Sequence, residues 1–197
     1  LVISEIALTL TLLVAAGLVL KSFSQLQSLS LGYEPRALFT ARFELPWRVY
    51  NNHEKIDAFA KALLDKVRTI PGVQNAAISS NGPLMGGWQT GFWREENPRP
   101  QPSDMLNSDL EVVAGHYFQT LKVPLIRGRM FNERDTKDSP RVIIIDQAMA
   151  EQYFPGEDPI GKRLGVDAGN DNEGWVMSEI VGVVAKMRFH AVDEMAP

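Results

Sequence analysis

The 197-residue chain contains no cysteine. This absence excludes a disulfide framework, a zinc site built from thiolates and a cysteine nucleophile, although it does not select a compartment. Basic residues are also few: 20 Lys and Arg stand against 24 Asp and Glu, a formal net charge of −4. Because nucleic-acid binding requires a basic surface, we expect no nucleic-acid partner. With 45% hydrophobic and 22% charged residues, the composition is typical of a globular protein.

Patterns that carry catalysis or metal binding are also absent from the sequence. His53, His116 and His190 lie far apart, and none has the spacing of a metal-binding pair. There is no G-x-S-x-G elbow, and the paired acids Glu95 and Glu96 lie in a polar stretch, where a solvated surface is the ordinary explanation. We therefore expect no catalytic residue, no metal site and no cofactor.

One segment imitates a phosphate-binding loop. Residues 156–162 read GEDPIGK, which matches G-x-x-x-x-G-K. However, Arg163 stands where a Ser or Thr should hold Mg²⁺, Pro159 removes a backbone amide, and the segment follows a predicted helix and not a strand. We interpret it as a turn, fixed by Pro and Gly, that joins a helix to a strand.

The chain has one long apolar run at its start. Residues 6–20 carry no charge, and together with residues 1–4 they would form a helix of about 30 Å, the thickness of one bilayer core. Three interpretations fit such a run: a transmembrane helix, a cleaved signal peptide and a buried core helix. The run is apolar on all sides, which favours the membrane span.

The helix is predicted to continue past Lys21 as a stalk. Phe23, Leu26 and Leu29 recur at helical spacing among Ser and Gln, which indicates an amphipathic helix outside the membrane. Gly32 is a plausible stop for it. These three apolar residues are candidates for packing against a partner stalk.

The remaining sequence predicts an α+β fold. Residues 37–45 alternate with period two and are predicted as a strand. Apolar residues at steps of three and four between Ile56 and Ile70 predict a helix, with Asn51 or Asn52 as its cap. Residues 73–79 read as a second strand, which completes a β-α-β unit.

An irregular excursion is predicted over residues 80–104, which contain several Gly and Pro residues. Trp88, Phe92 and Trp93 within it are candidate contacts for a partner or an apolar ligand, although aromatic residues in long loops more often cover their own domain. The later elements are a short strand from Leu110, a helix from His116 to Leu121, a turn at Arg127–Gly128, a strand at 142–145, a helix at 147–153 capped by Asp146, and a strand at 180–184.

Several blocks, in this order and spacing, resemble the periplasmic core domain of the MacB and FtsX-like family of ABC transporter permeases. The resemblance covers nearly the whole chain. The blocks are LLVAAGLVLKSF, GYEP, the LP that ends the first strand, IPGV, GHYFQTLKVPLIRGRMF, VIIIDQAMAEQYFPGEDPIGKRL and EIVGVVAKMRF. In that family, the segment that imitates a phosphate loop is a structural turn.

The resemblance implies a transmembrane helix and stalk at 1–31 and a domain of two lobes outside the membrane. Residues 32–81 would form the first β-α-β unit, residues 82–187 an inserted α+β lobe, and residues 188–197 the return to the first lobe, with the last β-α-β unit missing. The opening run resembles the start of the second half of a double-length permease. The Trp-rich stretch is a departure from the family and bears on its substrate or partner.

The implied function is mechanotransmission, in which a cytoplasmic ABC ATPase drives export or extraction by moving the extracytoplasmic domain. The implied partners are that ATPase, the other permease half or a second permease copy, the membrane and a periplasmic protein; the implied location is the bacterial inner membrane. Two alternatives stay open: an extracytoplasmic sensor that binds a ligand through its aromatic residues, and a secreted hydrolase with a cleaved signal. The substrate and the oligomeric state are not encoded in any of these patterns.

Overall fold

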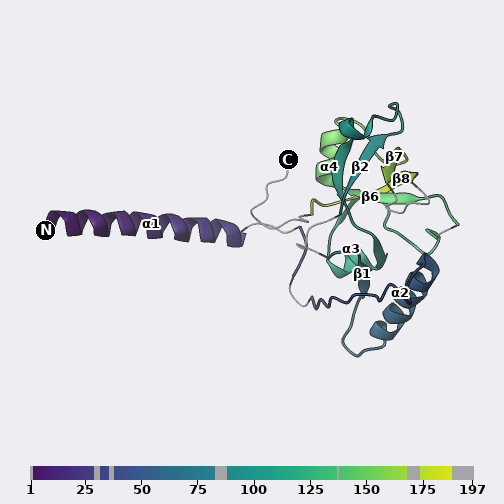
Figure 1. Cartoon of the computed structure of the whole chain (residues 1–197), viewed down its shortest axis with the longest axis horizontal. Coiled ribbons are helices and arrows are strands. Elements are labelled where there is room, and N and C mark those ends of the chain that lie inside the picture. Colours follow the sequence, from purple (N-terminus) through teal and green to yellow (C-terminus); the bar gives the residue numbers. More distant parts are fainter. Residues whose placement is uncertain are drawn as a thin grey trace.

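The computed structural model describes residues 2–28, 32–35, 38–82, 88–136, 138–167 and 174–187. Helix α1 (Val2–Ser28) projects away from a globular part that contains the other elements (Figure 1). The mixed content of helices and strands confirms the predicted α+β class.

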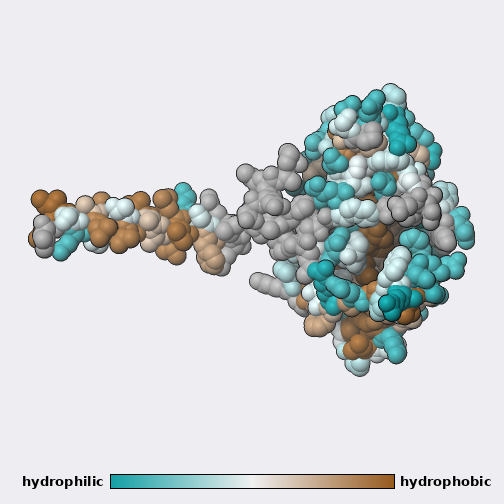
Figure 2. Space-filling view, viewed as in Figure 1, coloured by the Kyte–Doolittle hydropathy of each residue, from teal (hydrophilic) through white to brown (hydrophobic). Residues whose placement is uncertain are grey.

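Helix α1 has the length and composition of a membrane-crossing helix. The apolar stretch Val2–Ser24 is exposed among the described residues, and its surface is mainly hydrophobic (Figure 2). The hydroxyls of Thr9 and Thr11 donate to the carbonyls of Glu5 and Ala7 at 2.7 and 2.8 Å, so these two polar groups are satisfied within the helix. A buried core helix does not fit this exposure, and a membrane span or a signal sequence does.

The part of the chain after α1 begins with an extended segment and helix α2 (His53–Arg68). Asn52 caps this helix, because its side-chain oxygen accepts from the amide of Lys55 at 2.9 Å. After α2, strand β1 (Ala77–Ser79) pairs antiparallel with β4 (Val113–Gly115), and the short helix α3 (Tyr117–Thr120) follows β4. Leu64 is the buried residue of α2.

The strand predicted at 37–45 is wrong for the part that is described, residues 38–45, which pair with no other strand among the described residues. Instead, Phe43 and Tyr50 pack on Phe59 of α2, with ring centroids 5.5 and 5.3 Å apart. Phe39 is 90% exposed. Period-two alternation gives a segment two faces, but a strand also needs a neighbour for its backbone hydrogen bonds, and the sequence pattern cannot show whether one is present.

The second sheet is larger than the β1–β4 pair. Its order is β3 (Leu106–Leu110), β2 (Trp88–Arg94), β7 (Arg163–Asp167), β8 (Trp175–Val184) and β5 (Leu125–Gly128), all antiparallel, while β6 (Val142–Asp146) pairs with β8 in parallel. Helix α4 (Gln147–Tyr153) follows β6 directly, and Asp146 caps it by accepting from the amide of Met149 at 2.9 Å. Both the cap and the helix agree with the sequence prediction.

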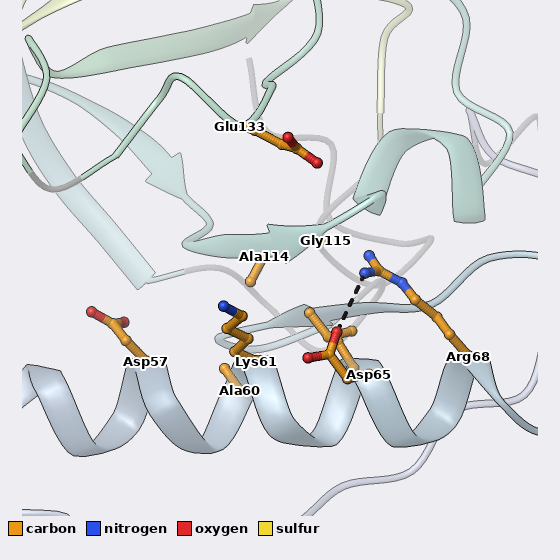
Figure 3. Close-up of a pocket in the computed structure, with 9 residues that line it drawn as sticks. Asp57, Ala60, Lys61, Asp65, Arg68, Ala114, Gly115 and Glu133 are labelled. Atoms are coloured by element: carbon orange, nitrogen blue, oxygen red, sulfur yellow. Dashed lines mark ion pairs between the residues drawn. The ribbon is translucent and has the colours of Figure 1, made fainter.

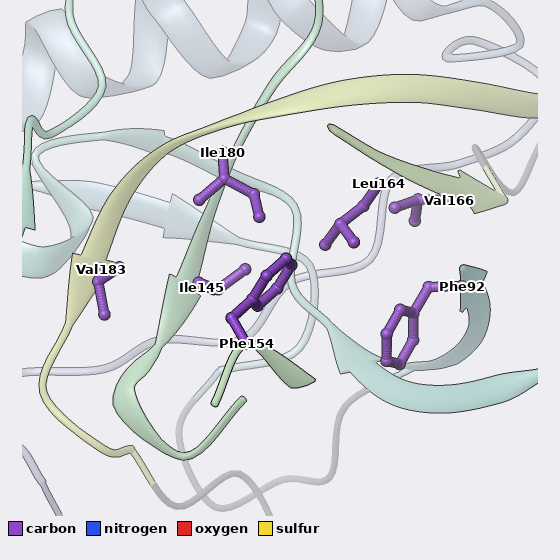
Figure 4. Close-up of a cluster of buried hydrophobic side chains, with 7 residues drawn as sticks. All are labelled: Phe92, Ile145, Phe154, Leu164, Val166, Ile180 and Val183. Atoms are coloured by element: carbon purple, nitrogen blue, oxygen red, sulfur yellow. The ribbon is translucent and has the colours of Figure 1, made fainter. Parts of the chain in front are cut away.

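Two hydrophobic clusters stabilise the globular part. The first contains Phe92, Ile145, Phe154, Leu164, Val166, Ile180 and Val183 (Figure 4), and α4 packs against it through Met149, Ala150 and Tyr153. The second lies around α3 and contains Tyr117, Phe118, Leu121, Val123, Val184 and Met187. Strand β8 contributes to both, with Ile180 and Val183 on the first cluster and Val184 on the second.

The irregular excursion predicted at 80–104 is also wrong, since it contains strand β2 and a 3₁₀ turn (Pro102–Asp104). Strand β2 is paired on both sides, by β3 and β7. Gly91, which looked like a turn residue, lies where an added Cβ would be 3.0 Å from both Met105 and Trp175. The glycine therefore accommodates neighbouring side chains within a sheet.

Two of the aromatic candidates differ in how much of the side chain is exposed. Phe92 is 1% exposed, whereas Trp88 is 44% exposed. We expect Phe92→Ala to lower the free energy of unfolding by about 3–5 kcal/mol, because it removes a fully packed ring, and Trp88→Ala to lower it by less than about 1 kcal/mol. Urea titration of the full chain in detergent, followed by circular dichroism, measures both. Equal losses would contradict the assignment of Phe92 to the core.

Candidate functional site

The segment that imitates a phosphate loop is a closed turn. Its backbone amides are already used: Gly161 donates to the carbonyl of Ile180 at 2.8 Å, Lys162 to Pro159 at 3.1 Å and Ile160 to the Asp158 carboxylate at 3.1 Å. In return, the amide of Ile180 donates to the carbonyl of Lys162 at 2.8 Å. A phosphate would have to displace these bonds, so the turn serves to attach its loop to β8.

Charged side chains also hold this turn. The Lys162 ammonium is paired with Glu157 and, at 3.1 Å, with Glu96. The Arg94 guanidinium contacts both of these carboxylates, at 2.9 Å for Glu157, and lies 4.7 Å from the ring centroid of Phe154. These hydrogen bonds lower the pKa of Glu96 and Glu157 and raise the pKa of Lys162. The Lys162 side chain therefore stabilises the turn through these ion pairs.

The predicted contact residues occupy different environments. Phe92 belongs to the first core cluster, so its prediction as a contact residue is wrong: its ring has no exposed face. Trp93 is half-buried against Trp175, and Trp88 is exposed, so their role in contact stays a prediction. Among the predicted stalk residues, Phe23 is exposed on α1, Leu26 lies within α1, and Leu29 falls outside the described residues.

A shallow pocket of about 460 Å³ lies between α2 and β4 (Figure 3). Charged residues form its rim, including the Asp65 and Arg68 pair at 3.9 Å, with Glu133 across from the helix. Gly115 allows α2 to come this close, because an added Cβ would lie 2.7 Å from the carbonyl of Ala76 and 3.2 Å from Leu64. Within the described part of the chain no group of His, Asp and Glu could hold a metal ion, here or elsewhere.

The contact that stands out for function is where the chain from α1 joins the domain. Gly32 has φ of +80° and lies so close to the backbone of Lys186 that an added Cβ would collide with that carbonyl. The amide of Glu34 donates to the carbonyl of Leu121 at 3.0 Å, and the amide of Ala185 donates to that of Pro124 at 2.9 Å. We call residues 32–35, 121–124 and 185–187 the junction.

The junction is tied to both core clusters. Tyr33 packs against the second cluster, and burial raises its pKa. Residues 185–187 continue directly from β8, so the segment that meets Gly32 is an extension of the strand that serves both clusters. A shallow pocket of about 360 Å³ lies along this contact, lined by Tyr33, Lys122 and Lys186 among others.

Asp146 holds the junction from the other side. Besides capping α4, its carboxylate accepts from the backbone amide of Met187. Burial raises the pKa of Asp146, against the opposing effect of these hydrogen bonds and of Lys186. Sequence reasoning identified the cap but missed the junction, because Gly32 and Lys186 come from opposite ends of the chain. The signal present in the sequence was Gly32 itself, read only as a helix stop.

Comparison with known proteins gives this geometry a context. The sequence matches the family described as MacB-like periplasmic core domain over residues 1–195. The chain belongs to this family. Curated relatives include the macrolide export ATP-binding/permease protein MacB of Neisseria gonorrhoeae and of Neisseria meningitidis, each 36% identical over 59 residues, 30% of this chain. The chain matches 9% of the length of these relatives.

Low similarity is also found to solved structures. The periplasmic region of MacB from Actinobacillus actinomycetemcomitans is 18% identical with a TM-score of 0.44, covering 66% of this chain and 52% of that one. The extracellular domain of the noncanonic ABC-type transporter YknZ from Gram-positive bacteria is 20% identical with a TM-score of 0.43, covering 68% and 64%. The family assignment rests on the match over residues 1–195 and confirms the resemblance inferred from the sequence blocks.

For this MacB-like domain we expect Gly32→Ala to weaken the junction. Gly72 provides a matched control, because its φ is +90° and nothing lies within 4 Å of an added Cβ. Gly72→Ala should cost about 1–2 kcal/mol for the left-handed backbone alone. Gly32→Ala should cost at least about 1–3 kcal/mol more, because it also drives a methyl group into the Lys186 backbone. Urea unfolding of both variants measures the difference, and equal costs would contradict the close approach.

Asp146 gives a pH-dependent prediction. Its folded pKa is raised above the unfolded value, so the stabilising contribution of the protonated form is present below the unfolded pKa and is lost as pH rises through the folded pKa. Asp146→Asn should remove this dependence and be at least as stable at pH 7, because Asn also caps helices. Asp146→Ala should lose about 1 kcal/mol. Unfolding measured between about pH 3 and 7, a range that begins below the ordinary Asp pKa of about 3.9, tests this. An Asn variant less stable than the Ala variant would refute it.

Proposed function

We propose that this chain is the extracytoplasmic mechanotransmission segment of an ABC transporter permease. In this proposal α1 spans the bacterial inner membrane and the domain lies on its periplasmic side. A cytoplasmic ABC ATPase supplies the energy, and the movement of α1 drives export or extraction of a substrate. The chain performs no chemistry of its own and works with the other permease half or with a second permease copy.

The observation that carries the proposal is how soon after α1 the chain contacts the end of the sheet. Helix α1 runs through the apolar stretch to Ser28, and Gly32, only four residues later, already packs on Lys186. A displacement of the helix therefore acts on the continuation of β8 after very little chain. Because packed cores and paired strands deform little, such a displacement would move the domain as a body.

The domain boundaries enter this proposal as well. We assign residues 1–31 to the membrane helix and stalk, and residues 32–81 and 82–187 to two lobes, with 188–197 leading back to the first. The two hydrophobic clusters and the separate β1–β4 pair support a division into lobes, although β8 serves both clusters. Whether this is the second half of a double-length permease stays a prediction.

A crosslink in the full-length permease tests mechanotransmission. Since this chain has no cysteine, a cysteine at Leu26 and one at the facing stalk position give a single new disulfide here. We expect oxidation to block transport and reduction to restore it, because a disulfide holds the two backbones within about 7 Å. Macrolide export is the first activity to measure, since the curated relatives are named for it. A pair of cysteines on the exposed face of α2, such as Ala58 and Ala62 replaced together, serves as the control for oxidation.

The result that would overturn the proposal is unchanged transport with complete crosslinking. The stalks would then not separate during the cycle, and the sensor alternative would explain the chain better. ATPase activity measured in parallel distinguishes a block in coupling, where hydrolysis continues, from a loss of the assembled complex, where it stops.

A further inference from the structure

Two tryptophans pack together on the face of the larger sheet that is opposite to Phe92, apart from the junction. Along β2, Phe92 points into the core while Trp93 lies on the opposite face. Trp93 meets Trp175 of β8, with ring centroids 5.1 Å apart and an interplanar angle of 62°. An added Cβ at Gly165 would collide with the Trp93 indole, so this glycine provides the flat floor on which the ring lies.

A cation covers the two indoles. The guanidinium carbon of Arg99 lies 5.6 Å from the Trp93 ring centroid and 5.0 Å from that of Trp175. Arg99 is exposed and forms no ion pair with any described residue, whereas Arg94, Arg129 and Arg163 each contact a carboxylate. A guanidinium that packs by its face on aromatic rings keeps the N–H donors along its edge for another group.

We propose that Trp93, Trp175 and Arg99 form a docking surface for an acidic segment of a partner protein. A carboxylate of that segment would accept from the guanidinium of Arg99, and the apolar side chain beside it would pack on the indoles. Trp and Arg are the residue types that dominate the energy of protein interfaces. A cation that forms no ion pair with any described residue favours an anionic group at this place, on a chain whose net charge is −4.

The shape of the surface favours a protein segment over a small molecule. Neither the pocket along α2 nor the pocket at the junction includes any of these three residues. Small ligands need a concave site that encloses them, whereas an open sheet face with an aromatic centre suits an extended segment. This surface shares no residue with the junction, so its failure would leave the coupling proposal intact.

Fluorine NMR on the full chain in nanodiscs tests the proposal. The chain has four tryptophans, so labelling with 5-fluorotryptophan gives four signals, which Trp→Phe variants assign. The probe is the capped peptide Gly-Asp-Phe-Asp-Gly, with Gly-Asn-Phe-Asn-Gly as the neutral comparison. We expect the acidic peptide to shift the Trp93 and Trp175 signals with saturation and to leave Trp47 and Trp88 unmoved, and the neutral peptide to bind several-fold more weakly.

Two substitutions sharpen the test. Arg99→Gln should lower the affinity for the acidic peptide by about fivefold or more, because it removes a charge-assisted hydrogen bond. Arg48→Gln is the control with the same loss of charge, since Arg48 is also exposed and follows the exposed Trp47. Unchanged signals at millimolar peptide, or equal affinity in wild type and Arg99→Gln, would overturn the proposal. So would shifts caused by phosphatidylglycerol nanodiscs but not by the peptide, because the surface would then bind lipid.

Discussion

The structure depends on one strand, β8, and on the backbone contacts at its end. This strand pairs with β7, β5 and β6 and supplies side chains to both hydrophobic clusters. The turn that imitates a phosphate loop is bonded to it through Gly161, Lys162 and Ile180. Its continuation receives the chain from α1 at Gly32. In the proposed mechanism, a force that reaches this continuation would pass to the strands paired with β8 and to both clusters.

Local signals in the sequence predicted local structure well. Asp146 and the helix behind it follow from a cap and from apolar spacing, which involve only neighbouring residues, and the structure confirms both. Asn52 is confirmed as the cap of α2 for the same reason. The apolar helix at the start could also be predicted from the local sequence, because the fifteen residues 6–20 carry no charge.

Features that depend on distant pairing were missed or misread. Residues 38–45 alternate like a strand but pair with no strand in the described part, and β2 lies within a stretch rich in Gly and Pro yet is paired on both sides. In each case the missing information was the neighbour. The aromatic candidates differ for a similar reason. Because side chains alternate along β2, Phe92 lies in the core and Trp93 lies on the opposite face, where it contacts Trp175. This contact joins residues far apart in the sequence, so local spacing could not predict it.

The two clusters differ in whether a buried polar group lies among their members. The buried members of the first cluster are all apolar. The second includes Tyr117, whose hydroxyl is buried without a hydrogen-bond partner in the described part of the chain, and whose pKa is raised first by burial and then by Glu111 and Tyr33. An unsatisfied buried hydroxyl costs about 1–3 kcal/mol. Tyr33 of the junction packs against this second cluster, so in the proposed mechanism a displacement of α1 would reach the less firmly satisfied cluster first. In that mechanism the domain moves as one body, because the first cluster, the closed turn and its salt bridges hold the larger sheet together.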